Sequence, residues 1–266
     1  MKNKFKKTKT IVVTGVSSGI GKAIVEQLLI NNGDYFVIGM GRKDIGFVNP
    51  NYRYVHLDLS DQTSITSAIK SLAQIKIDIF ISNAGVGYRG TVEDLKINYI
   101  RKQFEVNYLG PITLIKELLP QIKRPGGKII NIAALGSLIT VPTFGYYTVS
   151  KLALSKTLEV LQEESNLKIF NVYLGAVKSN FGKNIVETIN LEESNYKDLY
   201  SEWQTRFESF FKGRSKPEEV AKLIESIIND RSSVKFVKYR DRIIAMSKIL
   251  FPNSLHKKIV NYYYKI

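Results

Sequence analysis

The chain has 266 residues, of which 44% are hydrophobic, and it contains no cysteine. This length suits one large α/β domain or two small ones, and the ordinary apolar fraction excludes disordered, collagen-like and low-complexity proteins. The absence of cysteine excludes a disulfide scaffold, cysteine-ligated zinc and thiol catalysis. Because the chain has only two histidines, we expect no metal site.

The net charge of +15 is concentrated at the two ends of the chain. Residues 1–9 carry five lysines and no acidic residue, and residues 235–266 carry eight basic residues against one acidic residue. Residues 10–234 are close to neutral, with 26 basic and 23 acidic side chains. A near-neutral body with basic ends favours attachment to an anionic surface over binding in a nucleic-acid groove. We therefore expect no nucleic-acid partner.

The sequence does not resemble that of a membrane-spanning or exported protein. The longest stretch without a charge, residues 129–150, contains Pro142, glycines and several polar residues, which a spanning helix would not tolerate. The basic start runs directly into a predicted strand, without a cleavage site. We expect a cytoplasmic protein, which the basic ends could hold peripherally on the inner face of the membrane.

Predicted strands and helices alternate along the chain as far as residue 174. The strands are apolar on both faces and lie at 10–14, 35–39, 52–57, 77–82, 128–132 and 168–174. The helices between them lie at 20–32, 64–73, 98–121 (interrupted at Gly110-Pro111) and 144–164. This alternation predicts an α/β fold, a single Rossmann-type doubly wound parallel sheet with helices on both faces. We expect about seven strands, the seventh near 234–237.

We assign this domain to residues 10–238, between a basic N-terminal tail at 1–9 and a basic amphipathic extension at 239–266. Residues 178–214 interrupt the alternation of strands and helices. They are rich in Asn and Glu yet contain seven aromatic residues, Phe181, Tyr196, Tyr200, Trp203, Phe207, Phe210 and Phe211. A substrate lid over a hydrophobic ligand has such a composition. A pair of helices packed on the core would have it as well, so both interpretations are open.

A glycine-rich turn follows the first predicted strand, at TGVSSGIG, residues 14–21. Gly15 permits the tight turn, Gly19 lets the backbone approach a pyrophosphate, and Gly21 lets the next helix pack on the sheet. The first N–H groups of that helix attract phosphate. The position between a strand and a helix near the N-terminus supports dinucleotide binding, which a glycine pattern alone does not.

The residues after the second predicted strand indicate which dinucleotide binds. An NAD-selective site carries an acidic residue there to hold the ribose 2′-hydroxyl, whereas this chain has Gly41, Arg42 and Lys43. An arginine can grip a 2′-phosphate with paired hydrogen bonds. The pattern favours NADP(H), with NAD(H) as the alternative cofactor.

Taken in order, the motifs resemble those of the short-chain dehydrogenase/reductase family over residues 9–237. The matching segments are TGVSSGIG at 14–21, Asp58-Leu59, NAG at 83–85, Asn107, YTVSK at 147–151, GAVKS at 175–179 and KPEEVA at 216–221. The chain departs from the family's PGxVxT pattern, because Leu174 replaces the usual proline and Ser179 the threonine.

The resemblance implies an enzyme that interconverts a carbonyl and an alcohol on a small-molecule substrate by hydride transfer. Tyr147 would be the acid/base, Lys151 would hold the nicotinamide ribose, and Asn107 would position a water in a proton relay. The cofactor-binding residues are then Gly15, Ser17, Ser18, Gly19, Ile20, Gly21, Arg42, Asp58, Leu59, Asn83, Ala84, Gly85, Tyr147, Lys151, Val177 and Ser179. We also expect a homodimer or homotetramer.

The spacing of Tyr147 and Lys151 agrees with this chemistry. Four residues apart on one helix, they project into the same cleft. A phenol with a pKa of about 10 is a poor acid–base catalyst near neutral pH. The nearby ammonium and the positive oxidised nicotinamide should lower that pKa.

One residue that the family usually has is missing. The position thirteen residues before the tyrosine, normally serine, is Ala134. A hydroxyl that orients the carbonyl and stabilises the oxyanion is therefore absent. Three possibilities are open. Ser137 on the same loop takes the role, which we favour; the substrate supplies its own hydroxyl; or the protein binds NADP(H) with weak or no turnover.

The last residues extend beyond the expected fold. In the part after Pro252, Leu255, Ile259, Tyr263 and Ile266 fall near one helical face, whereas Lys257, Lys258, Asn261 and Lys265 lie mostly away from it. Such helices lie in membrane interfaces. Docking on the chain's own domain or on a sister subunit is the alternative. The aromatic segment and this extension together suggest an apolar, lipid-like substrate.

Overall fold

The computed structural model describes residues 8–30, 34–178, 186–187, 189–202, 215–232 and 236–264. Its main sheet contains β1 (Lys9–Thr14), β2 (Tyr35–Gly41), β3 (Tyr52–His56), β4 (Ile79–Ser82), β6 (Lys128–Ala134) and β7 (Lys168–Leu174). All neighbours are parallel, in the order β3-β2-β1-β4-β6-β7. The predicted doubly wound sheet is confirmed: β2 and β3 are added on one side of β1, and β4, β6 and β7 on the other, so the strand order reverses between β1 and β4.

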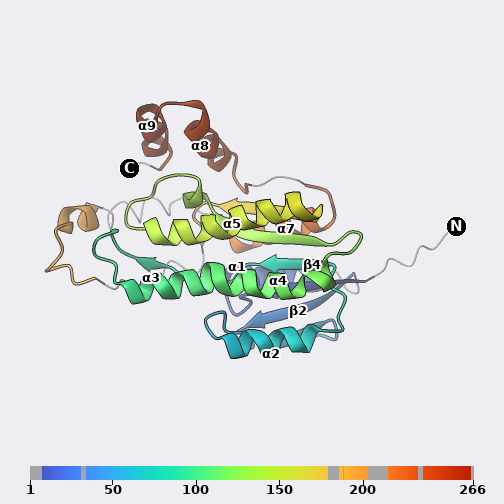
Figure 1. The fold of residues 1–266 in the computed structure, drawn as a ribbon. Helices are drawn as coiled ribbons and strands as arrows, with labels where there is room; N and C mark the ends of the chain where they lie inside the picture. Colours follow the sequence, from blue (N-terminus) through green and yellow to red (C-terminus); the bar gives the residue numbers. More distant parts are fainter. Residues whose placement is uncertain are drawn as a thin grey trace.

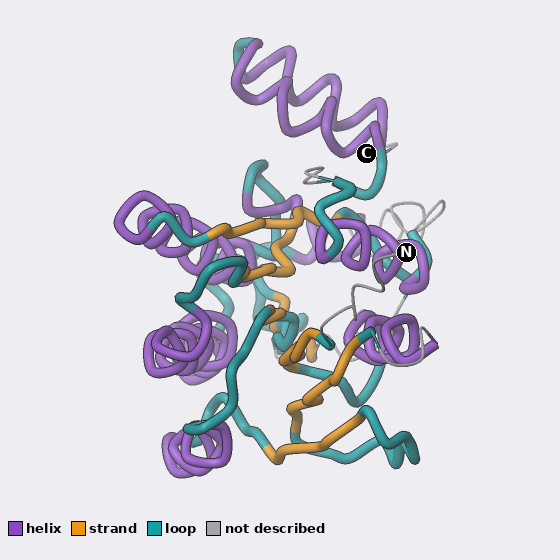
Figure 2. The backbone as a smooth tube through the Cα atoms, turned by 90° about the vertical axis from the view of Figure 1, so that its right-hand side faces the viewer, coloured by secondary structure: helices purple, strands orange, loops and turns teal. Residues whose placement is uncertain are grey.

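Helices cover both faces of this sheet (Figures 1 and 2). On one face lie α1 (Gly19–Ile30) and α7 (Pro217–Ile228), which pack on β1 through an aliphatic core that includes Ile24, Leu28 and Ile224. On the other lie α2 (Gln62–Leu72), α4 (Gly110–Ile122) and α5 (Gly145–Ser165), around Phe80, Leu114 and Leu158. Strands buried on both faces explain the continuous apolar runs in the sequence.

Several boundaries differ from the sequence-based expectation. Lys9 belongs to β1 and not to a separate tail, because its backbone pairs with Tyr35 and its ammonium donates to the carbonyl of Ile228. Near the expected seventh strand the structure describes one parallel bridge, between Tyr173 and Phe236, whose rings stack at 5.8 Å. Residues 233–235 lie outside the described part of the chain.

The helix expected over residues 98–121 is divided earlier than predicted. It consists of α3 (Ile97–Phe104), a π-helical turn η1 (Glu105–Leu109) and α4. Pro111 has no N–H, so the carbonyl of Asn107 receives no α-helical hydrogen bond from it. Gly110 packs so closely on the loop after β3 that a Cβ would lie 2.3 Å from the carbonyl oxygen of Leu59. The irregular turn therefore falls on Asn107, a predicted site residue.

A second, two-stranded parallel sheet lies beside the main one. It pairs β5 (Tyr88–Arg89) with β8 (Val186–Glu187) and so brings the start of the aromatic segment to the end of the NAG loop. At the C-terminus, α8 (Tyr239–Leu250) and α9 (Asn253–Tyr264) form a helical hairpin that projects from the body (Figure 1).

Candidate active site

A cavity of about 680 Å³ opens at the carboxyl ends of the parallel strands, where the strand order reverses. Its volume is typical of a ligand pocket. Of the predicted cofactor-binding residues that the structure describes, all but one line this cavity: Gly15, Ser17, Ser18, Gly19, Ile20, Arg42, Asp58, Leu59, Asn83, Ala84, Gly85, Tyr147, Lys151 and Val177. The exception, Gly21, packs directly behind Gly15. Ser179 lies outside the described residues. The fold thus gathers into one cavity residues that are far apart in the sequence.

The glycine turn has a shape that only glycine permits. Gly15 has φ of +74°, and a Cβ there would lie 2.7 Å from the Cα of Ala84. A Cβ on Gly21 would lie 2.1 Å from the carbonyl oxygen of Gly15. The turn leads directly into α1, whose first N–H groups have no partner within the helix. This cradle fits the pyrophosphate of a dinucleotide.

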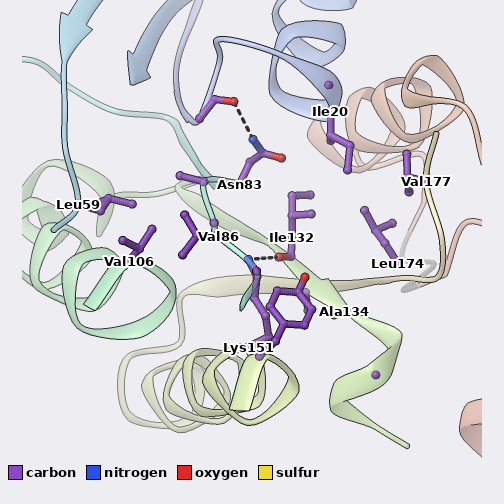
Figure 3. Close-up of a pocket in the computed structure, with 18 of the residues that line it drawn as sticks. Ile20, Leu59, Asn83, Val86, Val106, Ile132, Ala134, Lys151, Leu174 and Val177 are labelled. Atoms are coloured by element: carbon purple, nitrogen blue, oxygen red, sulfur yellow. Dashed lines mark hydrogen bonds between the residues drawn. The ribbon is translucent and has the colours of Figure 1, made fainter. Parts of the chain in front are cut away.

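Asn83 and Thr14 lock the NAG loop against the glycine turn. The Asn83 amide donates to the carbonyl oxygens of Thr14, at 2.9 Å, and Gly15, at 3.2 Å. In return, the Thr14 hydroxyl accepts hydrogen bonds from the backbone N–H groups of Asn83 and Ala84. Figure 3 shows Asn83 between the two loops. The role of Asn83 is therefore to position backbone around the cofactor cradle.

Where β2 and β3 end, the cavity carries two cationic side chains around one carboxylate. Arg42, Asp58 and Lys102 all line it. Partial burial raises the pKa of Asp58, but hydrogen bonds from Ser60 and the charges of Arg42 and Lys102 outweigh it and leave that pKa below its usual value. Sequence reasoning missed Lys102, because α3 contributes it from a different part of the chain. The cationic character suits a ligand phosphate.

Tyr147 and Lys151 both line the middle of the cavity from α5. Burial lowers the pKa of Lys151 to about 8, and its ammonium donates to the carbonyl of Ile132 at 3.3 Å (Figure 3). A Cβ on Gly85 would lie 3.1 Å from this ammonium, so glycine makes room for it. Burial also raises the pKa of the Tyr147 phenol above its usual value. The lowering expected from the ammonium together with the oxidised nicotinamide concerns the enzyme with its cofactor bound, and it stays a prediction.

Asn107 sits fully buried in the π-helical turn η1. Its side-chain oxygen accepts a hydrogen bond from the N–H of Val86 at 2.8 Å, and its amide donates to the carbonyl of Val86 and to Ser150. The Asn107 side chain thus connects α5, at the residue before Lys151, to the end of the NAG loop at Val86. Because Pro111 has no N–H, the main-chain carbonyl of Asn107 receives no helical hydrogen bond from it and can accept one from another donor.

The structure does not support Ser137 as the substitute for the missing serine. The Ser137 hydroxyl donates to the carbonyl of Thr148 at 3.3 Å, and Ser137 is not among the residues that line the cavity. Thr148 does line it, but its hydroxyl donates to the carbonyl of Gly145 at 2.9 Å. Ala134 faces the cavity and presents only a methyl group there. The geometry therefore favours a hydroxyl supplied by the substrate, or NADP(H) binding with weak or no turnover.

Beyond Tyr147 the cavity wall is apolar. It is formed mainly by Leu135, Ile139, Val141, Phe144 and Leu174. The first four follow β6 within the uncharged stretch 129–150, which is the sequence signal that could have identified this wall. The cavity therefore has a polar end, made for a phosphate-bearing ligand, and an apolar end.

Residues 189–202 of the aromatic segment contact the loop at 91–94. Tyr200 is buried, accepts a hydrogen bond from the N–H of Thr91 at 2.7 Å and donates to Asp94 at 3.0 Å. Ser194 also donates to Asp94, at 2.7 Å. None of these described residues lines the cavity. Trp203, Phe181, Phe207, Phe210 and Phe211 lie outside the described residues, so the lid stays a prediction.

Comparison with known proteins agrees with this geometry. The family model described as short chain dehydrogenase matches residues 9–190. The chain belongs to the short-chain dehydrogenase/reductase family. The family consists of NAD(P)-dependent dehydrogenases and reductases, which confirms the oxidoreductase class inferred from the motifs.

Relatives of this short-chain dehydrogenase/reductase occur in distant organisms. The chain is 30% identical over 193 residues to dehydrogenase/reductase SDR family member 7B of Mus musculus, a match that covers 66% of this chain and 60% of that relative. It is 32% identical over 201 residues to a 3-ketodihydrosphingosine reductase of Bacteroides thetaiotaomicron, with 71% of this chain and 72% of the relative covered.

Solved structures share the fold. A short-chain dehydrogenase from Streptomyces avermitilis is 25% identical, with a TM-score of 0.79 over 97% of this chain and 96% of that one. An alcohol dehydrogenase from the archaeon Thermococcus sibiricus, complexed with 5-hydroxy-NADP, is 25% identical, with a TM-score of 0.68 over 86% of this chain and 95% of that one.

Proposed function

We propose that this protein is an NADPH-dependent reductase that interconverts a carbonyl and an alcohol on an apolar, lipid-like substrate. The observation that carries the proposal is the division of the cavity, in which Arg42 and Lys102 line one end and Leu135, Ile139, Val141 and Phe144 the other, with Tyr147 between them. The bacterial 3-ketodihydrosphingosine reductase among the relatives supports a lipid-derived carbonyl. A homo-oligomer stays a prediction.

In this proposal the nicotinamide supplies the hydride, and the chain controls the proton. The Tyr147 phenol, kept protonated by its burial, donates its proton to the oxygen of the substrate carbonyl. Below a pH of about 8, Lys151 carries its proton and stabilises the phenolate that Tyr147 leaves behind. The main-chain carbonyl of Asn107 accepts a hydrogen bond from a water, and this water belongs to a relay that returns a proton to Tyr147.

The cofactor preference rests on Arg42 and Lys102. Arg42→Ala should weaken NADPH binding about ten- to hundredfold, since a charge-assisted contact contributes about 1.5–3 kcal/mol, and should hardly change NADH binding. Lys102→Ala should act in the same direction. Lys116→Ala on α4 is the matched control, because Lys116 is exposed and does not line the cavity. Fluorescence titration with both nucleotides measures the effect, and equal affinities in the unmodified protein would refute the preference.

The substrate class is tested with ketones that differ only in the length of their alkyl chain. Each methylene that the apolar wall covers contributes about 0.8 kcal/mol, so kcat/KM should rise about fourfold per methylene until the wall is filled. Ile139→Asp should abolish this dependence, whereas Val160→Asp, at an exposed position of α5, should not. A preference for sugars or other polar carbonyls would overturn the proposal.

Ala134 motivates a second candidate, an NADP(H)-binding protein with little or no turnover. The Ser137 and Thr148 hydroxyls are held by backbone carbonyls, so neither replaces the usual serine. Ketones that carry an adjacent hydroxyl could supply it themselves. Turnover of such hydroxyketones, with little turnover of matched plain ketones, would support the enzyme; NADPH binding without turnover of either series would select the second candidate.

A further inference from the structure

The C-terminal hairpin packs on the domain through its inner residues, which we call the root: Asp241, Ile244, Ala245 and Val260. In α8, Ile244 and Ala245 form an apolar cluster with Leu135 and Ile139 of the cavity wall. Between the helices, the Ser247 hydroxyl and the His256 ring are 2.8 Å apart, and both residues are buried. The extension therefore docks on its own domain, which was the alternative to a membrane-bound helix.

The hairpin also contacts, through Asp241, a residue that lines the cavity. This residue is 2% exposed, and its carboxylate packs on Gly175, where a Cβ would lie 2.9 Å from it. Burial raises the pKa of Asp241, although Arg240 and a hydrogen bond from the Gly175 backbone oppose the rise. Gly175 itself lines the cavity. The hairpin is thus held in a defined orientation by contacts to two cavity-lining segments.

The turn between the two helices is the part of the hairpin farthest from the sheet, as Figures 1 and 2 both show. We call it, with the adjoining helical turns at 246–258, the tip. Large apolar side chains of the tip are exposed: Met246 by 44%, Leu250 by 63%, Phe251 by 44% and Leu255 by 41%. Leu250, Phe251 and Leu255 lie on both sides of Pro252, so they surround one turn.

Cations surround this apolar turn. Lys248 of α8 and Lys257 and Lys258 of α9 are exposed within the tip, and Lys248 reaches across the turn to the side-chain oxygen of Asn253 at 2.8 Å. The acidic residue of segment 235–266 is Asp241, which is buried at the root. The tip therefore presents positive charge that no acidic residue of its own segment offsets at the surface.

The apolar face that binds the domain is not the stripe predicted from the sequence. Of that stripe, Leu255 is exposed and Ile259 is half-buried, whereas His256 and Val260 pack toward α8 and the domain. The side chains of Tyr263 and Ile266 lie outside the described residues. Leu255 is consequently left for contacts outside the domain, together with Leu250 and Phe251.

We propose that the tip docks on an anionic lipid bilayer, with Leu250, Phe251 and Leu255 inserted among the headgroups and the three lysines against lipid phosphates. Exposed apolar groups bordered by lysines match such an interface, because the long lysine side chains keep their charge in the polar layer. A second copy fits less well, since two tips would bring like charges together. No helix in the described part of the chain is long and apolar enough to cross a membrane.

The experiment is flotation of the full-length protein with vesicles, which does not depend on any reductase activity. Vesicles of phosphatidylcholine alone should leave the protein in solution, and an equimolar mixture with phosphatidylglycerol should capture it. Binding should fall as salt is raised, because the attraction is screened over a Debye length. Lys257→Gln together with Lys258→Gln should lower the partition coefficient about 25-fold, or about fivefold per basic residue.

A second variant tests the apolar part. Leu250→Ser with Phe251→Ser should reduce capture by at least about tenfold, since both apolar side chains lose their burial in the interface. Matched controls are Val48→Ser, an exposed apolar residue of the body, and Lys116→Gln, an exposed lysine of α4. Unchanged NADPH binding verifies that each variant is folded.

Three outcomes would overturn the proposal. The first is no capture by anionic vesicles at low salt. The second is equal capture of the tip variants and their controls. The third is a change in oligomeric mass, measured by light scattering, when Leu250 and Phe251 are replaced, which would show that a second copy of the chain covers the tip.

Discussion

At the nucleotide end of the cavity, backbone atoms determine the shape, because Gly15 and Gly21 approach other main-chain atoms and the Asn83 amide bonds to two carbonyls. At the substrate end, side chains determine it, because Leu135, Ile139 and Val141 line the wall. A backbone surface changes only when the chain moves, whereas a side-chain surface changes with every substitution. The comparison explains how one family can keep its cofactor and vary its substrate.

The residue between the two ends should give the largest effect. Tyr147→Phe removes the proton donor and leaves the ring in place, so kcat should fall by about 10²–10⁴. NADPH affinity should stay within about twofold, since the cradle is made by other residues. Steady-state kinetics and a fluorescence titration measure the two quantities. Retention of most of the activity would show that another group protonates the substrate.

A single methyl group at the nucleotide end should have the next largest effect. In Gly21→Ala the new Cβ would lie 2.1 Å from the Gly15 carbonyl oxygen, so the glycine turn must shift. The free energy of unfolding should fall by about 3 kcal/mol, and NADPH binding should weaken more than a hundredfold. Urea denaturation and titration test this.

Gly145→Ala is the control for the Gly21 prediction. It adds the same methyl group at the start of α5, where the Val92 side chain is 3.6 Å away, an ordinary contact. We expect its stability to stay within about 0.5 kcal/mol of the unmodified protein. Similar losses in both variants would mean that the backbone cradle is no more sensitive than other glycine positions.

Substitutions at the substrate end should be tolerated. Ala134→Ser adds a hydroxyl at the cavity and should raise the rate on plain ketones by up to about 10²-fold. Ser137→Ala should change kcat by less than about threefold, because that hydroxyl is bonded to the carbonyl of Thr148 and not to the cavity. Loss of most activity in Ser137→Ala would restore Ser137 as the replacement for the missing serine.

Local patterns of the sequence were sufficient for the sheet and for much of the site. The apolar runs predict the strands, the glycine turn needs only the strand before it and the helix after it, and Tyr147 and Lys151 share a face because they are four residues apart on one helix. These features depend on neighbours along the chain, so periodicity and turn chemistry determine them.

Tertiary contacts decided the rest. Lys102 joins Arg42 only because the fold brings α3 and the residue after β2 to the same carboxylate, Asp58, and the bond from Ser137 to Thr148 depends on how the loop after β6 folds back on α5. Asp241 meets Gly175, and Leu135 meets Ile244, across more than 60 residues of chain. A sequence displays which side chains are apolar or charged, but the partner of each is determined when distant segments compete to bury apolar surface and satisfy hydrogen bonds.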